Sequence, residues 1–120
     1  MTARALPVLL TCAAIAFPSP LFAGETKMTG AEIAVALTDH TVQGLLDDGK
    51  PWQQIFQKGG ATYYSVGGAQ SQGVWEVRGD QYCSQWPPGE SWSCYDLMTD
   101  GKTFTFVSAS GGRSSVTIHD

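Results

Sequence analysis

The sequence has few of the residues that usually perform catalysis or bind metal ions. It contains two histidines, His40 and His119, and three cysteines, which is too few for most acid–base, nucleophilic or zinc sites. No serine stands in the Gly-x-Ser-x-Gly pattern of a nucleophile elbow. The aspartates occur singly or in pairs in separate turn-like segments, unlike the alternating carboxylates of a calcium loop. We therefore expect a protein that is not an enzyme and that holds neither a cofactor nor a metal ion.

Basic residues and long apolar segments are also scarce. Seven lysines and arginines stand against eleven aspartates and glutamates, the formal net charge is −4, and the basic residues form no cluster. Nucleic acids and anionic membrane surfaces require several cationic contacts, so the sequence excludes both as partners. The most apolar stretch, residues 5–17, is shorter than the roughly 20 residues that span a bilayer. We expect a monomer whose partner is a small ligand or another protein.

The N-terminal residues have the order of a secretory signal peptide. Arg4 supplies a positive charge, residues 5–17 form a short apolar core, and Ala23 provides a small residue at the expected cleavage point. The sequence therefore predicts removal of residues 1–23. Residues 24–120 are then enough for one small domain, located in the periplasm or secreted from the cell.

The three cysteines have different expected roles. Cys12 lies inside the predicted signal peptide and raises the alternative of a lipid anchor, but Thr11 stands where such signals carry Ala, Gly or Ser. Cys83 and Cys94 remain as a pair, and an even number of cysteines in an exported chain predicts a disulfide. A bond that closes a loop of about a dozen residues contributes about 3 kcal/mol to stability.

One short helix is predicted over residues 30–37. Thr29 and Glu32 have the spacing of a capping box, in which each side chain accepts a hydrogen bond from the other residue's backbone N–H. Met28 and Ile33 stand where a hydrophobic staple would close over this helix start. A helix of this length must pack on other elements to persist.

After the helix, short apolar segments alternate with turn signals. The expected strands are residues 41–46, 52–57, 61–66, 73–78, 81–86, 91–98, 103–107 and 114–119. About eight short strands with a turn roughly every ten residues are typical of an all-β protein. Successive hairpins favour an antiparallel up-and-down meander, which closes into a barrel and thereby removes its edges.

The segment between the two later cysteines predicts a hairpin with a defined register. Pro88 and Gly89 suit the two central positions of a type II turn. Counting back symmetrically from this turn places Cys83 directly opposite Cys94, where the separation of the Cβ atoms suits a disulfide. The turn and the cysteine pairing therefore support the same hairpin.

Aromatic residues are the feature of this sequence most suited to binding. Alternation along the hairpin places Tyr82, Trp86 and Tyr95 on one face and Trp92 on the other face with the disulfide. Since adjacent strand residues point in opposite directions, Tyr63 and its neighbour Tyr64 cannot both face the core. Tyr and Trp are enriched where proteins contact ligands and partners. The candidate binding residues are Tyr82, Trp86, Trp92, Tyr95 and Tyr63, with packing over the disulfide as the alternative role for Trp92.

Five segments resemble a group of small exported bacterial proteins. They are residues 29–33, 41–42, 73–83, 94–95 and 100–101. The resemblance implies a lipocalin-like or related β-barrel fold and implies no particular chemistry. The chain is also similar, more weakly, to bacterial periplasmic inhibitors of secreted proteases, which combine a small barrel, one disulfide and a strand that contains Trp.

Two functions stay open at this point. The first is an exported, non-enzymatic binding protein with an apolar pocket for a small ligand at one barrel mouth. The alternative is a protein-binding module, such as a periplasmic inhibitor of a secreted hydrolase, that uses the hairpin of residues 82–95 as its contact surface. An enclosed pocket would favour the first function, and an exposed aromatic patch with a filled interior would favour the second.

Overall fold

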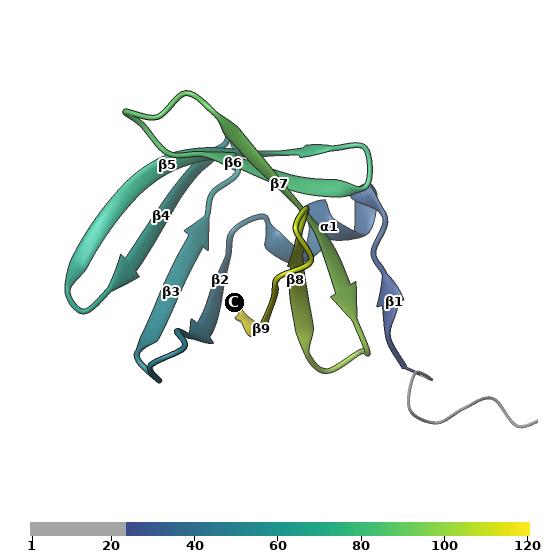
Figure 1. Ribbon diagram of the computed structural model, residues 1–120. Helices are drawn as coiled ribbons and strands as arrows, with labels where there is room; N and C mark the ends of the chain where they lie inside the picture. The colour runs from purple at the N-terminus through teal and green to yellow at the C-terminus, as the bar shows by residue number, and fades with distance from the viewer. Residues whose placement is uncertain (1–23) are drawn as a thin grey trace, which may run out of the picture.

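The computed structural model describes residues 24–120, which form a barrel with one helix at its end (Figure 1). The predicted signal peptide, residues 1–23, and the alternative of a lipid anchor on Cys12 lie outside the described residues.

Eight antiparallel strands follow one another round a closed ring. The strands are β2 (His40–Leu45), β3 (Pro51–Phe56), β4 (Ala61–Val66), β5 (Ala69–Arg78), β6 (Gln81–Gln85), β7 (Trp92–Thr99), β8 (Phe104–Ser108) and β9 (Arg113–His119). Each pairs with the next along the chain, and β9 pairs with β2 to close the ring. The prediction of a small up-and-down antiparallel barrel of about eight strands is therefore confirmed.

The two longest strands are each shared between two neighbours. In β5, Ala69–Val74 pair with β4, whereas Val74–Arg78 pair with β6. In β7, Trp92–Tyr95 pair with β6, whereas Tyr95–Thr99 pair with β8. Such staggered pairing is the register shift that closes a tilted sheet into a barrel. Side chains at alternate positions of every strand point into the interior.

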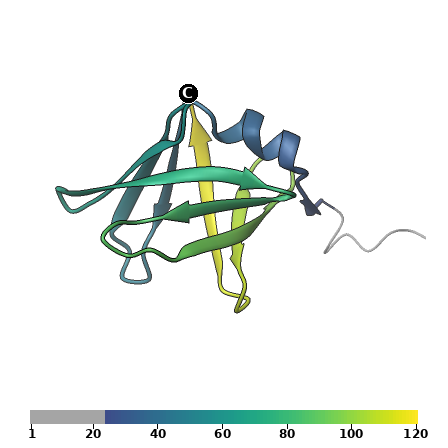
Figure 2. The same ribbon diagram turned by 90° about the horizontal axis from the view of Figure 1, so that it is seen from above.

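The helix α1 (Gly30–Leu37) covers one end of the barrel. Thr29 and Glu32 form the predicted capping box. Ile33 and Leu37 have no exposed surface, and the helix contacts β2, β5 and β6. In Figure 2 the helix lies at the same end as the C-terminal end of β9. The opposite end is formed by the β2–β3, β4–β5, β6–β7 and β8–β9 hairpins, and no helix of residues 24–120 covers it.

The turn between β5 and β6 holds the start of this helix. The backbone N–H of Gly30 donates a hydrogen bond of 2.7 Å to Oδ1 of Asp80, so a carboxylate stands at the positive end of the helix dipole. A Cβ atom on Gly30 would collide with the carbonyl oxygen of Gly79. The close approach therefore requires glycine at the first helical position.

A ninth strand, β1 (Thr26–Lys27), was not predicted from the sequence. It pairs with the end of β7, beyond the residues that pair with β6. The Lys27 ammonium lies 3.3 Å from the Asp96 carboxylate, which also accepts a hydrogen bond of 3.0 Å from Gln81. The hydrogen bond from Gln81 and the neighbouring Lys27 lower the pKa of Asp96. These contacts tie β1, β6 and β7 together outside the barrel.

The hairpin between β6 and β7 has the predicted register but a different turn. Cys83 lies opposite Cys94 and is bonded to it, which confirms the predicted disulfide. The peptide between Pro87 and Pro88 is cis, Gly89 does not adopt a positive φ, and the Gly89 N–H donates to the carbonyl of Trp86. The predicted type II turn is therefore wrong: two prolines occupy the centre of a type VI turn.

Candidate functional site

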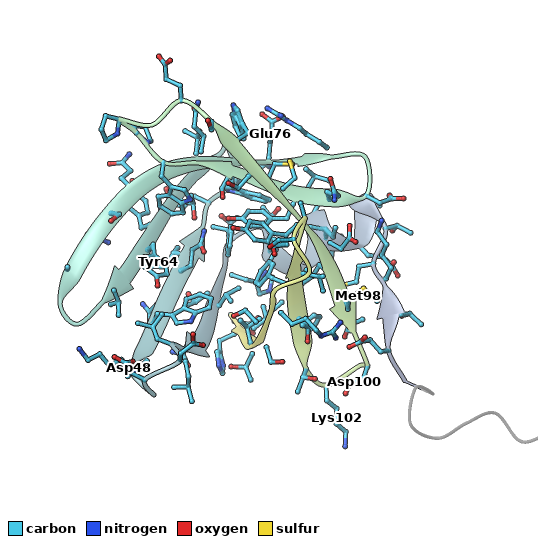
Figure 3. All side chains as sticks on the ribbon, viewed as in Figure 1. Asp48, Tyr64, Glu76, Met98, Asp100 and Lys102 are labelled. Carbon is cyan, nitrogen blue, oxygen red and sulfur yellow. A yellow bond between two sulfur atoms is a disulfide. The ribbon has the colours of Figure 1, made fainter. Side chains whose placement is uncertain are left out.

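A pocket of about 460 Å³ opens into the barrel from the end where its lining residues Ser71 and Pro87 are exposed, and it is called here the inner chamber. Its side chains come from β3, β4, β5, β6, β7, β8 and β9, so it belongs to the barrel as a whole. Figure 3 shows the side chains that occupy the barrel, with Tyr64 of β4 labelled. The lining residues are Trp52, Gln54, Tyr64, Ser71, Tyr82, Ser84, Trp86, Pro87, Tyr95, Phe106 and Ser114.

Aromatic rings form most of the chamber wall and pack against one another. The ring centroids of Tyr82 and Tyr95 are 5.7 Å apart in a stacked arrangement, and Phe106 lies 5.4 Å from Tyr82. On the other side, Tyr64 lies 5.5 Å from Trp52 and 6.2 Å from Trp86. Ring pairs at these distances attract one another, so the wall is held in shape by its own contacts.

Two glycines make room for the tryptophan rings of this wall. A Cβ atom on Gly44 would lie 2.7 Å from the ring of Trp52, and one on Gly73 would lie 2.6 Å from the ring of Trp86. Carbon atoms in contact are about 3.5–4.0 Å apart. The sequence therefore uses glycine inside two strands so that a large ring can lie flat against the backbone of a neighbour.

A small network of buried hydrogen bonds joins Gln54, Thr62 and Tyr82. The amide of Gln54 donates to the Thr62 hydroxyl at 2.9 Å and to the Tyr82 hydroxyl at 3.0 Å. Burial raises the pKa of Tyr82 above its ordinary value, against the opposing effect of hydrogen bonds from Ser84 and Gln54. The Tyr82 phenol is therefore neutral and keeps its proton at physiological pH.

A wider hollow of about 1,050 Å³ opens at the end of β2, β3, β4 and β9. Trp52 and Ser114 line both this hollow and the inner chamber. The two pockets therefore adjoin at these two residues.

Three of the five candidate binding residues line the inner chamber. Tyr82, Trp86 and Tyr95 do so, which means that their shared face points into the barrel. Tyr63 and Trp92 do not line it. The predicted division of faces along the hairpin is correct, but the face with three aromatic rings is the inner one.

Trp92 takes part in a small cluster on the outer face of the barrel. The Arg78 guanidinium lies 4.2 Å from the centre of the Trp92 ring, and its Nε donates to the Glu76 carboxylate at 2.7 Å. Figure 3 labels Glu76 on this outer side of β5. On the same outer face, Cys83 has no exposed surface, whereas its disulfide partner Cys94 is partly exposed.

The histidines lie outside both cavities. His40 Nδ1 lies 2.7 Å from the Thr38 carbonyl, and its Nε2 lies 3.3 Å from the Asp120 carboxylate. Asp39 instead accepts a hydrogen bond from the backbone of Lys58. His119 contacts only a threonine hydroxyl among its side-chain hydrogen-bond partners in residues 24–120.

Within residues 24–120, no group of three His, Cys, Asp or Glu side chains is placed to hold a metal ion. No helix in that range has the length and hydropathy of a membrane span.

The fold and the chamber define an antiparallel eight-stranded barrel with an aromatic interior cavity. Compared with protein-family models, with curated proteins and with solved structures, the chain gave no match. The geometry of the chamber is therefore the basis for a function, and the resemblance to small exported bacterial proteins stays a prediction.

Sequence reasoning missed the polar residues of the chamber. Gln54, Ser71, Ser84 and Ser114 line it together with the rings. Alternation gives one usable signal, because Gln54 lies between Trp52 and Phe56 on the same strand face. A glutamine in the middle of an apolar strand face indicates a buried polar partner, which here is Tyr82.

Proposed function

We propose that this protein is an exported, non-enzymatic binding protein that takes an uncharged small molecule into the inner chamber. The observation that carries the proposal is the wall of the chamber, which combines six aromatic rings with a few hydroxyl and amide groups. Ligand sites are typically concave and apolar, with a small number of polar groups that orient the ligand. The volume of about 460 Å³ lies within the range of such sites.

Charge in and around the chamber supports an uncharged ligand. No charged side chain of residues 24–120 lines it. An ion moved from water into such a site would lose its hydration without gaining a counter-ion, which is costly. Its polar groups among the described residues are hydroxyls, one amide and an indole N–H, which favours binding over acid–base catalysis.

Export is part of the proposal and rests on two observations. Residues 1–23 have the order of a signal peptide, and Cys83 is bonded to Cys94, as is usual in oxidising compartments. A periplasmic or secreted location accounts for both.

Native mass spectrometry of the non-reduced protein tests the proposal. The protein would be recovered from the exported fraction of cells that make it, as wild type and as two matched variants. Ser71 lines the chamber, and the next residue, Gln72, does not. Ser71→Trp should fill the chamber and remove a bound adduct, whereas Gln72→Trp adds the same ring outside and should keep it.

A wild-type protein that carries no adduct, and that binds none of a panel of uncharged aromatic compounds, would contradict the proposal. The search would then turn to the alternative, a protein-binding module such as a periplasmic inhibitor of a secreted hydrolase. In that case Trp92 is the first residue to test, because its ring is half-buried on the outer face. The same spectra report the cleavage point and any lipid on Cys12.

A further inference from the structure

The direction of the hydrogen bonds beneath the chamber can be derived from Thr62. The Thr62 hydroxyl donates its proton to the carbonyl of Ile55 at 2.8 Å, so its oxygen can only accept a bond from Gln54. Gln54 therefore presents its NH₂ group to Thr62, and the same nitrogen lies 3.0 Å from the Tyr82 hydroxyl. The Tyr82 oxygen thus accepts a hydrogen bond and still carries its own proton.

The hydroxyl of Ser84, two residues further along β6, likewise accepts a hydrogen bond and keeps its own proton. Its oxygen accepts a hydrogen bond of 3.2 Å from the indole N–H of Trp86, and Ser84 lines the chamber together with Tyr82. Even a hydrogen bond from one of these hydroxyls to the other would use only one of their two protons. Among the hydrogen bonds between described residues, neither hydroxyl donates elsewhere, so one O–H remains for the chamber.

We infer that the inner chamber selects a neutral, flat aromatic ligand that carries a carbonyl-type acceptor, and that the hydroxyl pair Tyr82–Ser84 donates to this acceptor. The inference rests on the proposed function and names the ligand class of the same site. A ligand without an acceptor would leave a buried donor unpaired, which lowers its affinity. The rings of the wall provide the stacking surfaces for the flat body of the ligand.

Two probes of the same shape test this donor. 9-Fluorenone has a carbonyl oxygen, and fluorene has a CH₂ group in the same position. Equilibrium dialysis of the disulfide-bonded protein, expressed from the full-length sequence, should show that fluorenone binds about fivefold more tightly, as expected for one hydrogen bond in a buried site. The carbonyl stretching band of bound fluorenone should lie at a lower wavenumber than in a hydrocarbon solvent.

The double variant Tyr82→Phe with Ser84→Ala removes both protons of the pair. Gln54 and Trp86, which also line the chamber, lose their acceptors with the two oxygens, and the Gln54 amide keeps its hydrogen bond to Thr62. The variant should bind fluorene as the wild type does and lose the preference for fluorenone. Tyr63→Phe, which removes a tyrosine hydroxyl that does not line the chamber, should keep the preference.

The outcomes separate this inference from the proposed function. If the wild type binds both probes equally, or if the carbonyl band is not shifted, the donor pair is refuted and the binding function stands. If the preference survives in the double variant, the assignment to Tyr82 and Ser84 is refuted. If neither probe binds, the inference fails, and the adduct and the panel of uncharged compounds decide the proposed function separately. The infrared band of the wild type decides the matter even where the double variant does not fold.

Discussion

Ile33 and Val35 offer a matched test of how α1 closes the barrel. Ile33 has no exposed surface, whereas Val35 on the same helix is 77% exposed. Ile33→Ala removes about three carbon groups, each worth about 0.8 kcal/mol on burial, and leaves a void beneath the helix. With the cavity term, the expected loss of unfolding free energy is about 3–4 kcal/mol. A domain of this size has a total of about 5–15 kcal/mol.

Urea unfolding followed by tryptophan fluorescence measures this loss, and thermal unfolding should show a decrease in Tm of at least about 12 °C. Val35→Ala is the control and should change stability by less than about 0.5 kcal/mol. If both variants lose the same small amount, α1 does not pack as a plug and the argument from burial is wrong. Probe binding by Ile33→Ala, measured well below its Tm, then reports whether the chamber needs the helix.

Two further predictions concern the hairpin of β6 and β7. Replacing Cys83 and Cys94 together by serine should lower the unfolding free energy by about 3 kcal/mol, because the bond closes a loop with a sequence separation of 11. A loss below about 1 kcal/mol in urea titrations would show that the hairpin does not need the bond. Burial raises the pKa of Tyr82 above 10.0, so the unfolded chain releases this proton first as pH rises. The contribution of Tyr82 to the free energy of unfolding should therefore be fully present below about pH 10 and decrease above it. Tyr82→Phe should reduce this alkaline decline in thermal unfolding, and Tyr63→Phe, on the outer face, should keep it.

Local signals in the sequence predicted those parts of the fold that local chemistry decides. The capping box identified α1, because Thr29 and Glu32 satisfy each other's backbone groups without help from the rest of the chain. The cysteine pair gave the register of the β6–β7 hairpin even though its turn type was wrong. Two adjacent prolines decide that turn through a cis peptide, which sequence spacing does not report.

Other features depended on contacts between distant residues and could not be predicted in this way. The strand β5 begins at Ala69, four residues before the predicted start, because its polar first half pairs with β4. Alternation grouped Tyr82, Trp86 and Tyr95 on one face, but it does not say which face is the interior. The closure of all eight strands into a ring determines which face is the interior, and it also brings Gln54 and Ser114 to the same chamber.

The pairing of β9 with β2 sets the order in which this barrel can be completed. Thr41 lies opposite His119, so the contact that closes the ring joins the first strand of the meander to the last. Until β9 is available, the growing sheet has two unpaired edges, at β2 and at β8, and no closed interior. A contact of such long range costs loop entropy and slows folding, and open edges invite pairing with other chains. A chain truncated before Arg113 would accordingly be expected to aggregate and to have no chamber, although most of its hairpins would still be present.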